Sequence, residues 1–336
     1  MKLKMTLLAA AVAMSSGYAL ANNDNSAEVD QTGWGNFAEV NQQNGGGNHD
    51  ADVTQIGFFN DSSILQVGTG ETASHYQNGW SNDSHSYQAG RGNEATVTQF
   101  GGNNNSETRQ WDRNNKATVD QFGVGNDSSV VQRGKYQRAT ILQTSFNNDS
   151  YVNQSGRNHV ADVRQTGSFN ESDVNQSGGG WLGGSNTAIV SQSGSFGGSD
   201  VVQDGLANKA KVDQGGRGND VSVNQVGSFN YSDISQSGIG DMAKTQQYGH
   251  ANRSYIDQDG FGNDADVRQD GAWNLSTVDQ SGFFGDVTVR QDGAFNVSAV
   301  AQSGGGFNNA THTQSGYSNV AVTSQVGSFN NSMISQ

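Results

Sequence analysis

Glutamine recurs every eleven residues along almost the whole chain. From Gln31 to Gln336 there are 28 such glutamines, and 24 of the 27 intervals between them are eleven residues long. The three longer intervals end at Gln55, Gln192 and Gln314 and contain glycine-rich insertions. A fixed short period is the signature of a repeat architecture, in which each unit buries its apolar face only against its neighbours.

The positions around each glutamine alternate between two kinds of residue. Asn lies six residues before the glutamine in 21 of 28 units, Val or Ile lies two before in 22 of 28, and Gly lies two after in 24 of 27. Ala or Ser usually lies four before, and polar or charged residues fill the positions between. This alternation at period two predicts a β-strand with one buried face.

The four residues between each glutamine and the next asparagine have the composition of a turn, as in TGSF at 166–169, with glycine available for positive φ. Seven strand residues and four turn residues make one unit, and two units make a 22-residue rung. About 28 units then give about 14 rungs and a column on the order of 70 Å long. The predicted fold is an all-β solenoid of strand-turn-strand rungs with two parallel in-register sheets, a cross-β arrangement capable of forming amyloid. A three-sided coil with a 33-residue repeat is the alternative.

Buried glutamine and asparagine side chains explain the strict register. In a parallel in-register stack each primary amide lies directly above its equivalent and can donate a hydrogen bond to it, whereas leucine could fill the space without fixing the register. Proline is absent from the chain, as expected if every strand needs its N–H groups. The predicted self-assembly ladder includes Gln31, Gln42, Gln165, Gln176, Gln214, Gln225, Gln325, Gln336, Asn36, Asn170, Asn219, Asn230 and Asn330.

Residues 1–21 are typical of a secretory signal peptide. Lys2 and Lys4 precede the apolar run MTLLAAAVAM, and Ala19-Leu20-Ala21 forms a cleavage pattern that leaves Asn22 first. The run is too short to span a bilayer, and no later stretch approaches eighteen apolar residues. We therefore expect an exported protein that is not embedded in a membrane, with residues 22–336 as one repeat domain.

Composition excludes several classes of function. With 32% hydrophobic residues and no cysteine, the chain lacks the material for a globular core or a disulfide framework. Loss of Lys2 and Lys4 with the signal lowers the formal charge from −14 to −16, which argues against nucleic acid as a specific ligand. No catalytic triad, carboxylate pair or phosphate-binding loop can be recognised apart from the repeat pattern, so we expect no enzyme and no cofactor.

Three further patterns are better explained by the repeat than by a binding site. The histidines are scattered one to a repeat without ligand spacing, so we expect them to be solvated or at ladder edges; they are His49, His75, His85, His159, His250 and His312. The Asp-rich stretch 258–271 lacks the patterns of a calcium β-roll or an EF-hand, and no metal site is expected. Packing at the column's corners is favoured over sugar stacking for the turn aromatics Phe169, Phe229, Trp273, Phe295 and Phe329.

Both ends of the repeat are expected to be uncapped. The first unit begins about three residues after the predicted cleavage, and the last glutamine is the last residue. One rung buries too little apolar surface to offset the backbone entropy of its residues, so its stability must come from neighbours. Unpaired edges at both ends then predict polymerisation.

The unit with Gln, Gly and Asn at these spacings resembles the curlin repeat of the curli fibre subunits over residues 25–336. The resemblance places the ladder positions at Asn170, Ser172 and Gln176 and their equivalents. It implies a major-subunit-like protein that crosses the outer membrane of a Gram-negative-type bacterium unfolded, with periplasmic chaperones and a dedicated secretion pore as partners. It also implies assembly into a homopolymeric, pilus-like amyloid fibre on the cell surface, seeded by a minor nucleator, for biofilm and adhesion.

Two other functions were considered. A monomeric secreted solenoid, such as an adhesin or an ice-binding or surface-binding module, would present a flat outward threonine array if it bound ice. A polysaccharide-cleaving β-helix would need long irregular loops and clustered carboxylates. The outward positions here are mixed and charged, and the turns are regular, which favours the fibre subunit.

Overall fold

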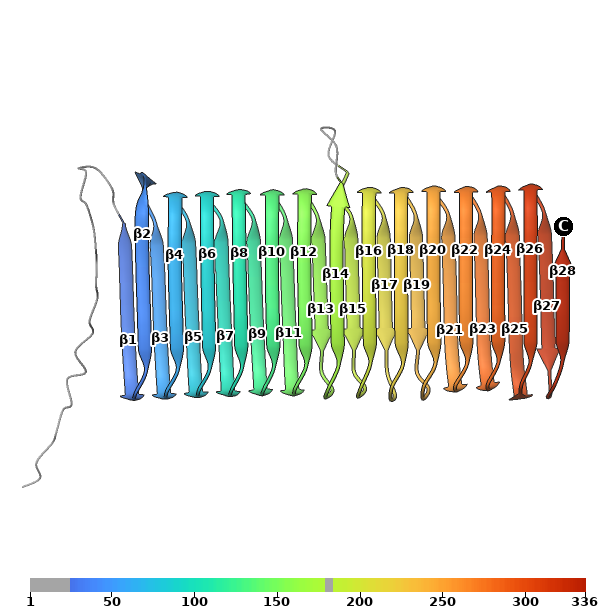
Figure 1. Cartoon of the computed structure of the whole chain (residues 1–336), viewed down its shortest axis with the longest axis horizontal. Helices are drawn as coiled ribbons and strands as arrows, with labels where there is room; N and C mark the ends of the chain where they lie inside the picture. Colours follow the sequence, from blue (N-terminus) through green and yellow to red (C-terminus); the bar gives the residue numbers. More distant parts are fainter. Residues whose placement is uncertain (1–24, 179–183) are drawn as a thin grey trace, which may run out of the picture.

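The computed structural model describes residues 25–178 and 184–336, and its regular structure is entirely β-strand (Figure 1). Twenty-eight strands form two 14-stranded sheets, the odd-numbered strands in one and the even-numbered strands in the other. All pairs within each sheet are parallel, which confirms the predicted two-sheet solenoid of about 14 rungs and excludes the three-sided coil. The predicted signal peptide, residues 1–21, lies outside the described residues.

Most strands are nine residues long. The odd sheet contains β1 (Ser26–Trp34), β3 (Asp50–Phe58), β5 (Thr72–Trp80), β7 (Glu94–Gly102), β9 (Lys116–Val124), β11 (Arg138–Phe146), β13 (Val160–Gln165), β15 (Thr187–Gln192), β17 (Lys209–Gln214), β19 (Tyr231–Gln236), β21 (Arg253–Phe261), β23 (Leu275–Phe283), β25 (Val297–Gly306) and β27 (Val320–Val326). The even sheet contains β2 (Phe37–Gly47), β4 (Asp61–Thr69), β6 (Asp83–Arg91), β8 (Asn105–Arg113), β10 (Asp127–Lys135), β12 (Asp149–Arg157), β14 (Glu171–Gly178), β16 (Gly198–Leu206), β18 (Asp220–Ser228), β20 (Met242–His250), β22 (Asp264–Ala272), β24 (Asp286–Ala294), β26 (Asn309–Tyr317) and β28 (Asn331–Ser335).

From the start of each strand to its ladder glutamine, register is kept along the column, because each strand pairs with the strand one rung away at equivalent positions. Gln132 of β10, for example, pairs with Gln110 of β8 and Gln154 of β12. The longest insertion does not break this pattern, since Gln165 of β13 still pairs with Gln192 of β15. The prediction that insertions only lengthen loops holds for this one, but at the other two the register shifts at the strand end, between Gln43 and Gly47 of β2 and between Ser281 and Phe283 of β23.

The expected strand of seven residues, from asparagine to glutamine, is wrong at both ends. A typical strand begins one residue after the asparagine and continues three residues past the glutamine, as in β18 (Asp220–Ser228) with Gln225. Pairing extends this far because the glycine two residues after each glutamine also lies in register with its equivalent, for example Gly227 with Gly205. The asparagine instead closes the turn.

Most turns have two positions with positive φ. At the first, two residues after the glutamine, Gly227 has φ 117°, and a Cβ there would lie 2.0 Å from the carbonyl oxygen of Gly249 in the next rung. Glycine is therefore required both by the dihedral and by the close approach of the neighbouring turn. The second position, four residues after the glutamine, tolerates side chains in the left-handed region, and Phe229 occupies it with φ 59°. The sequence predicted positive φ for glycine only.

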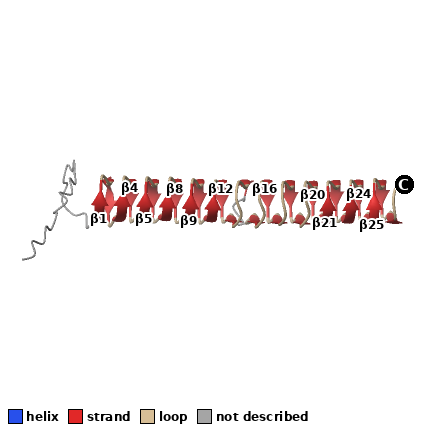
Figure 2. Cartoon of the chain, turned by 90° about the horizontal axis from the view of Figure 1, so that it is seen from below, coloured by secondary structure: helices blue, strands red, loops and turns tan. Residues whose placement is uncertain are grey.

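The turns define two long edges of the column. Odd strands all end at one edge, the lower one in Figure 1, and we call this the odd-turn edge. Even strands all end at the upper edge, the even-turn edge. Seen from below, the column is a thin slab with the two sheets as its layers (Figure 2).

Candidate functional site

The buried layer between the sheets holds the residues that the repeat predicts to point inward. Along β11 (Arg138–Phe146) the buried side chains are Ala139, Ile141 and Gln143, and their neighbours in the strand are more exposed. The aliphatic residues of successive rungs form one core that extends from Val97 to Ala310. A smaller cluster of the first rungs contains Val53 and Ile64.

Both glutamine ladders are continuous from the first rung to the last. In each sheet Nε2 of every glutamine donates to Oε1 of the glutamine in the next rung toward the C-terminus, over distances of 2.6–3.4 Å. The two ladders therefore share one direction along the column.

The second hydrogen of each glutamine amide binds the backbone of the other sheet. Gln132 Nε2 donates to the carbonyl oxygen of Lys116 at 3.0 Å, and Gln143 Nε2 donates to that of Asp127 at 2.8 Å. A buried amide left without partners would cost about 1–3 kcal/mol, and here both of its donor hydrogens and its oxygen are used. The ladder thus ties each sheet along the column and the two sheets to each other.

The asparagines form a second kind of ladder, which runs in the opposite direction. The backbone N–H and Nδ2 of Asn148 both donate to Oδ1 of Asn126 in the preceding rung, at 3.1 and 3.2 Å. Nδ2 also donates to the carbonyl oxygens of Thr144 and Gly167, at 2.9 and 2.8 Å. Each asparagine therefore closes its own turn and fixes that turn to those of its neighbours.

The residues predicted to form the ladder all lie in these columns, but their burial depends on the rung. In the interior rungs they are buried: Gln165, Gln176, Gln214, Gln225, Asn170, Asn219 and Asn230. Of those in the outermost rungs, Gln325 is buried, Gln31, Gln42, Asn36 and Asn330 are half-buried, and Gln336 is exposed.

The ladders give the two ends of the column different hydrogen-bonding groups. Among the described residues, no glutamine donates to Oε1 of Gln31 or Gln42, so the first rung presents acceptors. In the last rung, Gln325 Nε2 donates to the backbone carbonyl of Asn309 in β26, and Gln336 Nε2 donates to that of Val320 in β27. Among the described residues, neither amide makes the ladder bond that interior amides make. One end therefore offers amide oxygens and the other amide hydrogens.

Four of the six histidines are buried inside the column at ladder or core positions, so the expectation that they are solvated or at ladder edges is wrong for these four. His49 and His159 replace asparagine, while His75 and His312 replace valine or isoleucine. His75 is held by three serine hydroxyls, with Nδ1 2.7 Å from Ser62 Oγ. Its position two residues before Gln77 is itself the signal of burial that a search for ligand spacing missed.

Charged groups also enter the asparagine column. Glu71 is fully buried, and its Oε2 accepts the backbone N–H of Asn93 at 2.8 Å. Burial raises the pKa of Glu71 to about 7, and burial lowers the pKa of His75 to about 3. Asp241 takes the same column position and likewise has a raised pKa because of burial. These residues make the ladder sensitive to pH.

The turn aromatics lie on the edges and stack along the column axis. Phe169 stacks on Phe196 with ring centroids 5.0 Å apart, and Phe295 contacts Trp273 at 6.3 Å. Phe229, which is 58% exposed, contacts the ring of His250. The turn aromatics therefore pack at the corners of the column. Their side chains, including those of Trp273 and Phe329, nevertheless remain about half exposed or more.

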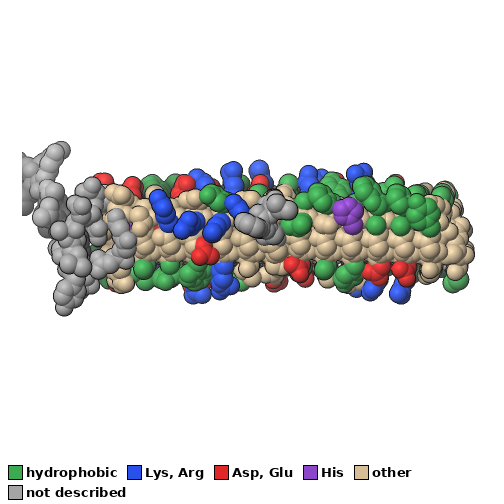
Figure 3. All heavy atoms as spheres, turned by 90° about the horizontal axis from the view of Figure 1, so that it is seen from above, with side chains coloured by type: hydrophobic (Ala, Val, Ile, Leu, Met, Phe, Trp, Pro, Cys, Tyr) green, Lys and Arg blue, Asp and Glu red, His purple; other side chains and the backbone are tan. Residues whose placement is uncertain are grey.

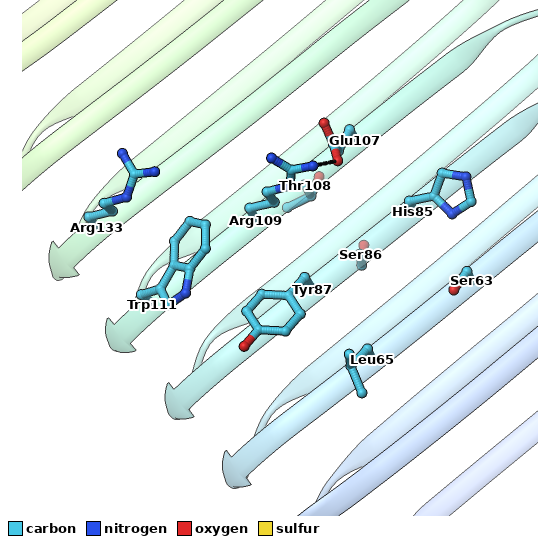
Figure 4. Close-up of a pocket in the computed structure, with 10 residues that line it drawn as sticks. All are labelled: Ser63, Leu65, His85, Ser86, Tyr87, Glu107, Thr108, Arg109, Trp111 and Arg133. Carbon is cyan, nitrogen blue, oxygen red and sulfur yellow. Dashed lines mark ion pairs between the residues drawn. The ribbon is translucent and has the colours of Figure 1, made fainter.

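The outer face of the even sheet has one shallow hollow, which Figure 4 shows between Leu65 and Arg133. Arg133 lies over the ring of Trp111, and Arg109 forms an ion pair with Glu107. The groups lie side by side on neighbouring strands and do not converge on a common point (Figure 4). In residues 25–178 and 184–336 no three His, Cys, Asp or Glu side chains gather as a metal site would need, and no helix there is long and apolar enough to cross a membrane.

Comparison with known families finds one model in this chain. The curlin associated repeat matches residues 23–57, 72–101, 138–167, 200–227, 241–271 and 262–283, segments that lie along most of the column. Each match contains at least one ladder glutamine with its glycine two residues later. No curated protein matches the sequence.

Proposed function

Because the chain is a protein of the curlin repeat family, we propose that it is the structural subunit of an extracellular functional amyloid fibre of the curli type. In this proposal columns join end to end, so that the two sheets and their ladders continue from one molecule into the next. The fibre contributes to a biofilm matrix and to surface adhesion.

The observation that carries the proposal is the direction of the glutamine ladders. Nε2 donors at the last rung and Oε1 acceptors at the first rung are complementary, because both ladders run the same way along the column. A contact between two different ends of identical molecules is heterologous, and repetition of a contact that does not close on itself gives an open filament.

The strand edges support the same mode of growth. In the described part of the chain β1 and β2 have a neighbour on one side only, as do β27 and β28. An incoming column would supply parallel partners for these strands, together with the next step of each ladder. Unpaired edge strands are a ready template for such pairing.

Export and nucleation complete the proposal. The predicted signal peptide takes the chain to the periplasm, where chaperones and an outer-membrane pore of the curli type pass it unfolded to the cell surface. A chain whose rungs depend on their neighbours is compatible with this route, because it folds only as rungs accumulate. A minor nucleator with the same repeat would provide the first exposed edge.

Elongation of preformed seeds tests the docking faces. The variant Gln31→Ala, Gln42→Ala, Gln325→Ala, Gln336→Ala removes ladder groups only from the outermost rungs. Its matched control, Gln165→Ala, Gln176→Ala, Gln214→Ala, Gln225→Ala, removes the same number from interior rungs. We expect the first variant to elongate wild-type seeds at least tenfold more slowly than the control at equal monomer concentration.

Two results would contradict the proposal. Equal elongation rates for both variants would show that the outermost rungs are not the docking faces. A wild-type chain without its signal that stays a soluble monomer for days after release from denaturant would favour a monomeric secreted solenoid instead. Fibre diffraction of the assembled protein should give reflections near ~4.7 and ~10 Å.

A further inference from the structure

Exposed aromatic residues form a stripe along most of the odd-turn edge. Beyond the residue that follows the ladder glutamine, eleven of the 14 odd turns carry at least one exposed large apolar side chain. We define the stripe by these residues: Trp34, Phe58, Phe59, Trp80, Phe146, Phe169, Phe196, Ile239, Phe261, Phe283, Phe284, Phe307 and Phe329. An exposed apolar surface of this extent on a soluble molecule marks an interaction site.

Stacking within the stripe does not hide it. Phe284, Phe307 and Phe329 stack in sequence with ring centroids 5.3 Å apart, and Phe169 stacks on Phe196. Even so, side chains of the stripe remain between 42% and 78% exposed. A stacked ring covers one face of its neighbour along the axis and leaves the outward side of the edge open.

The odd-turn edge is also almost free of charge. Among all its turns, between the ladder glutamine and the next strand, only Arg217 and Asp259 are exposed charged residues, and Asp241 is buried. The formal charge of the whole chain is −14. Uncharged apolar surface on an acidic molecule is the place where a second molecule can approach at the least electrostatic cost.

The even-turn edge differs in chemistry although it has the same geometry. Figure 3 looks onto this edge and shows basic side chains before residue 179 and hydrophobic side chains after residue 183. Arg91, Arg113, Lys135 and Arg157 occupy equivalent positions in four consecutive rungs. On the even-turn edge the exposed aromatic rings of the described residues lie mainly at Phe229, Trp273, Phe295 and Tyr317, whereas the stripe on the odd-turn edge extends from Trp34 to Phe329, with gaps after β7, β9 and β17.

We propose that the odd-turn edge docks against the odd-turn edge of a second copy of this chain, so that two columns lie side by side. The contact is lateral and is separate from end-to-end growth. A second copy fits because its stripe has the same rung spacing, so that rings of one column can meet rings of the other in register over many rungs. Contact of one surface with itself gives a closed pair.

The available area is sufficient for a stable pair. Aromatic side chains have about 150–250 Å² of surface each, and the twelve aromatic residues of the stripe are about half exposed. They therefore offer on the order of 1,000 Å² per column, against the roughly 800 Å² per partner of a typical stable interface.

Edge-to-edge docking also keeps the acidic surfaces apart. On the outer face of the even sheet Asp127, Asp149 and Glu171 lie in register on consecutive strands. Partial burial, followed by the charges of Asp127 and Glu171, raises the pKa of Asp149. Packing two such faces together would add to this repulsion, whereas edge-to-edge pairing leaves both sheets of each column in solvent.

Matched variants at one turn position test the proposal. In the odd-edge variant Phe169, Phe196, Phe284 and Phe307 are changed to Asn, and in the even-edge control Tyr136, Phe229, Trp273 and Phe295 are changed to Asn. All eight residues lie in the left-handed region, with φ between 51° and 61°. Asn is accepted there, as Asn103 shows with φ 52°, so neither variant should strain the turn.

Electron microscopy of seeded fibres gives the readout. We expect wild type and the even-edge control to form laterally paired filaments, and the odd-edge variant to form single filaments with an unchanged elongation rate. Pairing that survives in the odd-edge variant, or that is lost in the control instead, would overturn the proposal, as would wild-type filaments that never pair.

Failure of the proposed fibre function can be told apart from failure of this inference. If the chain forms no fibres, sedimentation equilibrium of the soluble columns replaces microscopy. A concentration-dependent dimer of wild type that is at least tenfold weaker in the odd-edge variant supports lateral docking without axial growth. Monomeric wild type at concentrations of tens of micromolar overturns it.

Discussion

Glu71 places a carboxyl group where most rungs have an asparagine amide, and replacement by its neutral isostere should make the column less sensitive to pH. The side chain is fully buried, its Oε2 accepts the backbone N–H of Asn93, and Oε1 has no hydrogen-bond partner among the described residues. Burial raises the pKa from 4.5 to about 7. Glu71→Gln keeps the shape and the acceptor for Asn93 but removes the charge.

The size of the effect follows from the two pKa values. In the unfolded rung the carboxyl group loses its proton near pH 4.5, whereas in the folded rung it keeps the proton until about pH 7. The contribution of Glu71 to stability is therefore fully present below pH 4.5, falls as the pH rises between these values, and stays low above pH 7. The difference between the two pKa values, at about 1.36 kcal/mol for each pH unit, corresponds to a loss of folding free energy on the order of 3 kcal/mol.

Hydrogen exchange of the segment 61–82 in wild type and Glu71→Gln measures this loss as a local opening free energy. Near pH 8 we expect protection in the variant to exceed that of wild type by on the order of 100-fold, and near pH 4.5 we expect a difference below about threefold. His75 in the same rung affects both proteins equally and cancels. A pH-independent difference, or none, would refute the argument that a buried carboxylate destabilises this rung.

Three further outcomes follow from the turns, the rung and the core. Gly227→Ala should cost at least about 3 kcal/mol in hydrogen-exchange protection, because its Cβ would meet the next turn, whereas Gly218→Ala, with φ 66° and nothing within 4 Å, should cost only about 1–2 kcal/mol. Deletion of 215–236, one whole rung, should leave fibre assembly intact by dye binding, but deletion of 226–236 should impair it, and equal tolerance would contradict the two-sheet rung. His75→Val should reduce the loss of stability that wild type shows as the pH falls from 6.5 toward 3, measured by denaturant midpoint, and His49, His159 and His312, whose pKa values burial also lowers, should account for part of the loss that remains. An unchanged loss in the variant would contradict a buried neutral imidazole at position 75.

Much of this fold is predictable because one eleven-residue pattern determines several levels of structure at once. The alternation around Gln165 and Gln176 gives the strand, its buried face and its register, and the strict spacing gives the stack. The amide ladders follow from register alone, since parallel pairing of identical positions brings each Nε2 within reach of the next Oε1. Local pattern and global fold agree here, which is the condition for a reliable prediction.

Prediction failed where a residue departs from the pattern. His75 was expected to be solvated or at a ladder edge because of its residue type, and no environment was predicted for Glu71; a histidine or a carboxylate is usually a solvated group. Their column positions, two and six residues before Gln77, require burial whatever the side chain, and the structure follows the column. The left-handed turn position shows the same effect, because Phe229 adopts φ 59° where local preference favours glycine.

The difference in composition between the two edges was not predicted, because the sequence and the structure repeat with different periods. The sequence repeats every eleven residues, but the structure repeats every 22, because successive units belong to opposite sheets. Alignment of all units on their glutamines therefore mixes Phe169 of the odd-turn edge with Phe229 of the even-turn edge. When odd and even turns are separated, the aromatic stripe and the basic series that begins at Arg91 are already visible in the sequence. Stacking along the column involves every eleven-residue unit, whereas a lateral contact through one edge involves only alternate units. A 22-residue periodicity in turn composition is therefore the sequence signal of an edge with its own function.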